Sequence, residues 1–185
     1  MERIIKKMED KYLVDSLDFV EKVFTEYENE KEGKLVRKLI VEIRSKKYYI
    51  PELELIMVNE EDEMLGYLMF SGFHLENRYE DDLLLLSPVA VKTKFQRQHI
   101  SKDLIEYGFE KAKNMGYKAV IVEGDPKNYR SRGFVTAADH NILPGNTVNL
   151  PHISCLMVKE LVPGALMNIR GIVDYSFYNI LLEEW

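Results

Sequence analysis

Residues 83–123 constrain the fold more than any other part of the chain. They open with the almost wholly apolar run 83–91, which is typical of a β-strand covered on both faces. Apolar residues at helical spacing follow from Ile100, and Gly116 supplies the left-handed residue that ends many helices. A second apolar run at 119–123 predicts another buried strand. A strand, a helix and a strand of these lengths predict a right-handed parallel crossover in an α/β protein.

The connection between the first strand and the helix carries cations at Lys92, Lys94 and Arg97. A helix N-terminus presents backbone N–H groups without intrahelical acceptors, together with the positive end of the helix dipole. One interpretation is therefore a phosphate or pyrophosphate seat over residues 98–101. The other is an ordinary strand-to-helix connection whose lysines keep it soluble, and this stretch alone favours the second interpretation.

Topology gives an independent expectation for the position of a ligand. In open α/β sheets, ligands lie beyond the carboxyl ends of the strands. That rule predicts one crevice lined by Val91, by the loop 96–101 and by the turn 124–129. Pro88 has no N–H to donate to a sheet ladder, so the first strand is expected to bulge or to lose its neighbour there.

The segment FQRQHISKDLI resembles the acyl-CoA pyrophosphate loop of the GNAT superfamily of N-acetyltransferases, Gln/Arg-x-x-Gly-x-Gly/Ala. Gln96 falls on the first position, His99 on the middle glycine and Ser101 on the final small residue. Further segments resemble one bacterial subgroup of that family: KAVIVEGDPKNYRSRGFVTA, LVPGALMNIRGIVDY and IPELELIMVNEEDEMLGYLMFS. The chain departs from the family pattern at His99, which stands at the position of the middle glycine. Its imidazole must point away from the pyrophosphate, clash with it, or donate to it when protonated.

The resemblance implies a single acyl-CoA N-acyltransferase-like domain over residues 1–185, with an α/β (α+β) fold. Its central sheet is expected to be mixed and mostly antiparallel, with the parallel strand–helix–strand core and flanking helices. Periodicity predicts a helix ending before a charged loop at 27–34, and a second helix whose Arg44 points outward. A hairpin follows, with the acidic residues 60–63 in a solvated turn, and then a polar connection at 76–82.

The resemblance also implies the chemistry, which is transfer of an acetyl group from acetyl-CoA, as co-substrate, to a primary amine of a small molecule or peptide. Transfer is direct, without a covalent enzyme intermediate. Tyr129 is the candidate general acid for the departing thiolate, or else it only packs the short helix before Phe134. Glu123 is the candidate base, and Glu54 and Glu76 are comparable candidates. The residues expected to hold the coenzyme are Val89, Ala90, Val91, Gln96, Arg97, Gln98, His99, Ile100, Ser101 and Asn128.

Two other functions stay open. One is a catalytically weak or silent acyl-CoA-binding module with a sensing or scaffolding role, which His99 at the glycine position motivates. The other is a nucleotide-binding α/β protein, which ranks last because the chain lacks a Walker loop and a Gly-x-Gly-x-x-Gly fingerprint.

Composition limits the partners. A formal charge of −6 argues against general nucleic-acid binding, and the chain has no apolar run long enough to span a membrane. The single cysteine, Cys155, excludes an intramolecular disulfide and favours a reducing compartment, so a soluble cytoplasmic protein is expected. The four histidines lack metal-ligand spacing, and no metal is predicted. The apolar segment SFYNILLEEW could pack on its own sheet or in a homodimer.

Overall fold

The computed structural model describes residues 2–178 of the 185-residue chain. Its contacts divide the chain into two compact units. The first unit comprises the chain up to residue 70 together with residues 87–108, and the second comprises residues 71–86 together with the chain from residue 109. Three elements contribute to both units: β3 (Met64–Leu75), β4 (Arg78–Val91) and α3 (Ile100–Asn114).

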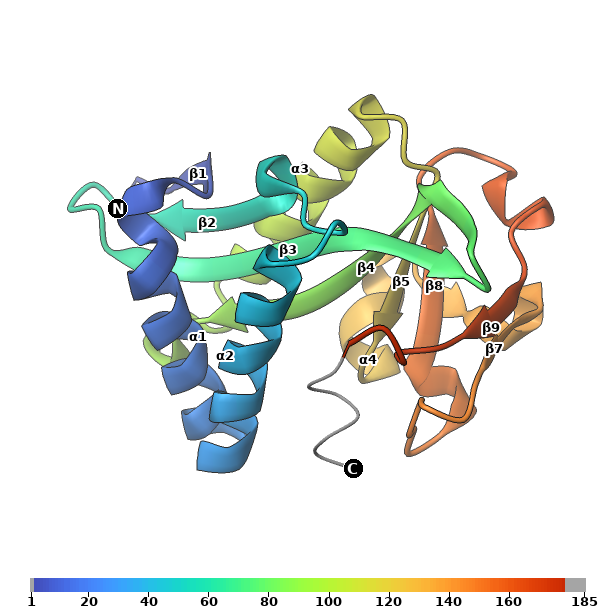
Figure 1. Ribbon diagram of the computed structural model, residues 1–185. Helices are drawn as coiled ribbons and strands as arrows, with labels where there is room; N and C mark the ends of the chain where they lie inside the picture. The colour runs from blue at the N-terminus through green and yellow to red at the C-terminus, as the bar shows by residue number, and fades with distance from the viewer. Residues whose placement is uncertain (1, 179–185) are drawn as a thin grey trace. The chain divides into compact units, whose positions relative to one another are not determined.

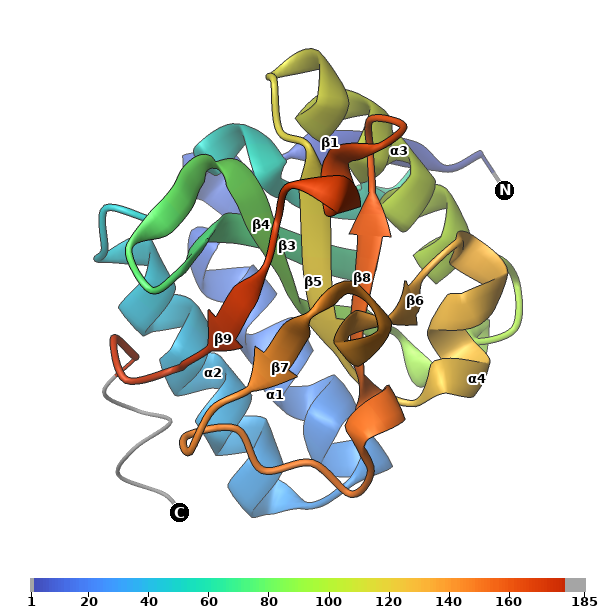
Figure 2. The ribbon, with the colours of Figure 1, turned by 90° about the vertical axis from the view of Figure 1, so that its right-hand side faces the viewer.

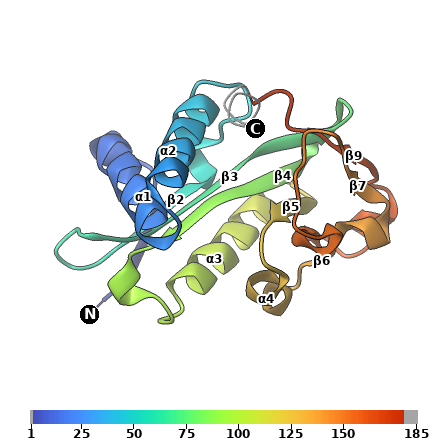
Figure 3. The same cartoon turned by 90° about the horizontal axis from the view of Figure 1, so that it is seen from below.

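In the first unit, β1 (Ile4–Lys7), β2 (Glu54–Val58) and the start of β3 pair in that order (Figure 1). Both pairings are antiparallel, and β2 and β3 form the expected hairpin. All five residues of β2 are buried, because elements of this unit cover both faces of the hairpin. Figure 3 shows α1 and α2 on one face of β2 and β3 and the start of α3 on the other.

Helices α1 (Leu13–Tyr27) and α2 (Glu30–Arg44) lie side by side (Figure 1). The prediction of a loop at 27–34 is wrong, because α2 already begins at Glu30. The Asn29 side chain caps this helix by accepting a hydrogen bond from the Glu32 N–H at 3.0 Å. Two short 3-10 turns, η1 (Asp10–Tyr12) and η2 (Pro51–Leu53), precede α1 and β2.

In the second unit, the strands pair in the order β4, β5 (Ala119–Glu123), β8 (Leu156–Glu160) and β6 (Val135–Thr136). The β4–β5 pair is parallel, as the crossover predicts, and its register runs over Leu83–Leu85. Strand β8 is antiparallel to both β5 and β6. A separate parallel pair, β7 (Ile142–Pro144) with β9 (Gly171–Val173), completes this unit (Figure 2).

Short helical segments connect the strands of the second unit. They are α4 (Pro126–Tyr129), η4 (Arg130–Arg132), η5 (Ala137–His140), η6 (Ile153–Cys155) and η7 (Ala165–Met167). The polar connection expected at 76–82 is shorter than predicted, because β4 already begins at Arg78 and only Glu76 and Asn77 form the turn. Both turn residues have the left-handed backbone of a tight connection.

The predicted α/β (α+β) class is confirmed: the sheet is mixed and mostly antiparallel, with a parallel strand–helix–strand core and flanking helices. Helix α3 ends at Asn114 and Gly116 is left-handed at φ 99°, as expected. Within residues 2–178, no helix combines the length and the apolar character needed to cross a membrane. The single domain over 1–185 stays a prediction. The end of SFYNILLEEW, residues 179–185, lies outside the described residues, whereas Tyr178 is fully buried against Phe177.

Candidate functional site

The loop before α3 has an unusual backbone. Arg97 and His99 have φ values of 61° and 66°, in the left-handed region that glycine adopts easily and other residues rarely. His99 accepts the first helical hydrogen bond, from the Asp103 N–H at 2.9 Å, and right-handed residues follow it. A left-handed residue followed by a right-handed one turns successive N–H groups toward a shared concavity that suits an anion. His99 therefore has a backbone conformation that glycine adopts easily, at the position that the resemblance assigns to the middle glycine.

Close packing holds this end of α3 in place. A Cβ atom on Gly66 of β3 would lie 2.6 Å from Ile100 and 2.9 Å from Leu104, so only glycine lets the first turn approach this closely. Both helix residues are almost fully buried, whereas residues 96–99 are exposed. The exposed loop therefore leads directly into a helix turn that is packed against β3.

The cations of the loop are arranged differently from the sequence expectation. Lys92 and Lys94 both pair with Glu63, the last residue of the acidic turn. Asp62 of the same turn pairs with Lys6 and Lys11, and residues 60–62 are exposed, as expected of a solvated turn. These pairs form because β1, the 3-10 turn η1 and the segment after β4 all lie next to the β2–β3 turn in the first unit.

A cation that sequence reasoning missed contacts the loop instead. The Arg3 guanidinium donates to the main-chain oxygen of Gln98 at 2.7 Å and to its side-chain oxygen at 2.7 Å. The two residues are 95 positions apart, so no local pattern could have indicated the contact.

The residues expected to pair with the pantetheine arm, Val89, Ala90 and Val91, form the end of β4. Ala90 is 2% exposed, and its neighbours are half-buried. The β4–β5 register ends at Leu85, before Pro88, in agreement with the expected loss of a neighbour there.

Tyr129 lies at the end of α4, which Asp125 caps by accepting from the Lys127 N–H at 2.9 Å. Its ring packs edge-on against Phe134 with centroids 5.6 Å apart, and a Cβ on Gly124 would lie 2.6 Å from it. Burial raises the pKa of the phenol, and the Arg132 guanidinium partly opposes that shift. The hydroxyl has no hydrogen-bond partner among residues 2–178. The Tyr129 ring therefore packs against Phe134, and its hydroxyl is protonated at neutral pH.

Glu123 ends β5, and its carboxylate accepts a hydrogen bond from the Tyr175 hydroxyl at 3.2 Å. Although Glu123 is exposed as a residue, partial desolvation raises the pKa of its carboxyl, and the hydrogen bond partly offsets that shift. The main-chain N–H of Tyr175 donates to the Thr147 hydroxyl at 2.8 Å, which anchors the tyrosine. Sequence reasoning missed this partner, because 52 residues separate it from Glu123.

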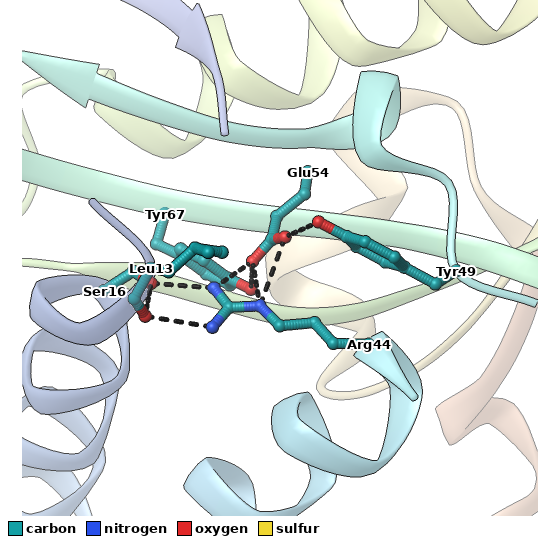
Figure 4. A network of polar contacts seen from close by, with 6 residues as sticks. All are labelled: Leu13, Ser16, Arg44, Tyr49, Glu54 and Tyr67. Atoms are coloured by element: carbon teal, nitrogen blue, oxygen red, sulfur yellow. Dashed lines mark hydrogen bonds and ion pairs between the residues drawn. The ribbon is translucent and has the colours of Figure 1, made fainter. Parts of the chain in front are cut away.

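The two comparable base candidates have structural partners. Glu54 is fully buried, receives hydrogen bonds from Tyr49 and Tyr67 at 2.6 and 2.5 Å, and pairs with Arg44 at 2.6 Å (Figure 4). The expectation that Arg44 points outward is therefore wrong. Glu76, at the β3–β4 turn, pairs with Arg78 at 3.2 Å. The assignment of Glu123 as the base stays a prediction.

The structure brings the candidate residues together in two groups. The first unit holds Val89, Ala90 and Val91 with the loop residues Gln96, Arg97, Gln98, His99, Ile100 and Ser101. The second unit holds Glu123, Asn128 and Tyr129, and exposed Asn128 lies in the same helical turn as Tyr129. The single crevice expected from topology stays a prediction. In the part of the chain that the structure describes, no group of three His, Cys, Asp or Glu side chains could hold a metal ion.

The chain thus has an α/β fold that contains a parallel strand pair, and the loop before α3 has a left-handed residue directly before the helix. The Acetyltransferase (GNAT) family model matches residues 17–137, which is more than half of the chain. An uncharacterised N-acetyltransferase of Escherichia coli K12, YhbS, is 30% identical over 128 residues, which cover 66% of this chain and 71% of YhbS. The chain therefore belongs to the GNAT family of N-acetyltransferases.

Solved structures agree on the fold. A crystal structure of E. coli YhbS with CoA aligns with a TM-score of 0.81 at 22% identity, covering 100% of this chain and 94% of the other. A GNAT acetyltransferase from Brucella melitensis with acetyl-CoA gives 0.66 at 23% identity, with coverage of 88% and 90%.

Replacing His99 with glycine is expected to tighten acetyl-CoA binding roughly three- to tenfold, because glycine adopts the left-handed backbone of this position easily and has no side chain to obstruct an approaching phosphate. Titration calorimetry measures the change. His99→Ala is the matched control, because it removes the ring but keeps the Cβ and should recover only part of the gain. Unchanged affinity in both variants would contradict an obstructing imidazole. Weaker binding in both variants would indicate that the imidazole contacts the coenzyme instead.

Proposed function

We propose that this protein is an acetyl-CoA-dependent N-acetyltransferase that moves an acetyl group directly to a primary amine of a small molecule or peptide. The observation that carries the proposal is the left-handed His99 at the start of α3. It preserves a backbone that can seat a pyrophosphate, at the position where the family has a glycine. The CoA and acetyl-CoA in the two similar crystal structures support the same donor.

The proposed chemistry assigns a role to each group of residues. Backbone groups of Val89, Ala90 and Val91 hold the pantetheine arm as an added strand would, and the N–H groups of residues 98–101 hold the pyrophosphate, flanked by the side chains of Gln96 and Arg97. The acceptor amine must be neutral to attack the thioester carbonyl, and Glu123 takes its proton directly or through water. As the C–S bond breaks, Tyr129 donates its phenolic proton to the departing thiolate. Exposed Asn128, the residue before Tyr129, offers its side-chain amide for hydrogen bonding to the coenzyme.

The first test is calorimetric titration of the full chain with acetyl-CoA, CoA and ATP. Micromolar binding of acetyl-CoA and CoA without binding of ATP is the expected result. Release of free CoA from acetyl-CoA is then followed with a polyamine, an aminoglycoside and a lysine-containing peptide as probe acceptors. Binding without acceptor-dependent CoA release would favour the silent acyl-CoA-binding module, and no binding of acetyl-CoA would overturn the donor assignment.

A further inference from the structure

The loop at residues 96–101, which is proposed to hold the coenzyme, contacts Arg3 near the start of the sequence. Arg3, the residue before β1, is half-buried and directs two guanidinium N–H donors at Gln98. One bond holds the main-chain oxygen and the other holds the side-chain oxygen, both at 2.7 Å. A planar guanidinium that makes two bonds to one residue restricts both its position and its orientation.

Gln98 is the residue that needs such restriction. It lies between Arg97 and His99, which both adopt left-handed backbone conformations that are costly for residues other than glycine. The direction of the Gln98 carbonyl also sets the direction of the His99 N–H, since both belong to one planar peptide. A partner that holds this carbonyl therefore aims the His99 N–H, which belongs to the proposed pyrophosphate seat, away from Arg3.

The two lysines beside the loop do not hold the Gln98 carbonyl. Lys92 and Lys94 are directed toward Glu63. The charge that contacts the loop main chain thus comes from a residue 95 positions earlier in the sequence rather than from the loop itself.

We propose that Arg3 is a positioning residue for the coenzyme seat, which holds the Gln98–His99 peptide in the orientation that receives the pyrophosphate. This inference rests on the proposed function, because it concerns the same seat. It assigns to Arg3 a role through Gln98 and no direct contact with the coenzyme.

The experiment compares wild type, Arg3→Gln and Arg3→Lys in calorimetric titrations with CoA and with dephospho-CoA, which lacks the 3′-phosphate but keeps the pyrophosphate. Both variants are expected to bind both ligands roughly five- to tenfold more weakly, because neither side chain presents two nitrogens in the planar fork that fits both Gln98 oxygens. Lys7→Gln is the matched control: it removes a cation of β1 whose ammonium has no partner in the described part of the chain, and it should bind as wild type does.

Each outcome decides the proposal. Equal weakening for the two ligands in both variants supports it, and the melting temperatures of the unliganded variants should match that of wild type within a degree or two. Wild-type affinity in Arg3→Gln overturns it. A loss confined to CoA, or full rescue by lysine, also overturns it, because either result means that the charge attracts a phosphate directly. Failure of the wild-type protein to bind CoA would instead overturn the proposed function itself.

Discussion

Replacement of Arg44 with methionine is expected to lower the free energy of unfolding by about 3–5 kcal/mol. Arg44 is the cationic partner of Glu54, whose side chain is fully buried (Figure 4). Methionine fills similar space but leaves the carboxylate in a low-dielectric interior with only the hydroxyl donors of Tyr49 and Tyr67. It also removes the Arg44 N–H that donates to the Leu13 carbonyl at 2.9 Å. Urea unfolding followed by circular dichroism measures the loss.

The same helix offers a matched control. Arg37 of α2 also pairs with two carboxylates, Asp18 and Glu21, but these partners are much more exposed. Arg37→Met should therefore cost less than about 1 kcal/mol. Adding Glu54→Gln to Arg44→Met should recover a measurable part of the loss, because the double variant no longer buries a lone charge. Equal losses for the Arg37 and Arg44 variants would contradict the assigned burial.

Replacement of Tyr129 with phenylalanine is expected to lower the turnover number roughly 10²-fold or more, the typical contribution of a general acid. Phenylalanine keeps the ring contact with Phe134 and the close approach to Gly124, so folding and acetyl-CoA affinity should stay nearly intact. Because burial raises the pKa of the Tyr129 phenol, the hydroxyl is protonated at neutral pH and can act as an acid there. Release of CoA under saturating acetyl-CoA, with an acceptor from the screen, measures the effect.

Tyr107→Phe controls for the loss of a phenol, since this tyrosine of α3 is 44% exposed and outside the candidate site. It should turn over as wild type does. A Tyr129→Phe variant with wild-type turnover would remove the general-acid role and leave Tyr129 as a packing residue of α4. A variant with lower turnover and equally weaker acetyl-CoA binding would point to a disturbed coenzyme seat instead.

The strand–helix–strand unit could be derived from residues 83–123 alone, because each of its elements is encoded by a local periodicity. The apolar runs became β4 and β5 in parallel register, and Gly116 ended the helix as expected. Tyr107 of α3 is nevertheless exposed, because a surface helix buries only part of its circumference. The position of His99 in the loop could also be inferred from the sequence, whereas its left-handed backbone could not.

Side-chain pairing across the chain was decided only by the tertiary structure. Arg44 has the spacing of an exposed helix face, and it is half-buried because β2 brings a buried carboxylate under it. The contacts of Arg3 with Gln98 and of Tyr175 with Glu123 join positions 95 and 52 residues apart. Local sequence encodes which segments become strands and helices, since backbone periodicity acts over a few residues. Which charges and hydroxyls meet depends on how those segments pack, and the candidate site depends on these long-range contacts.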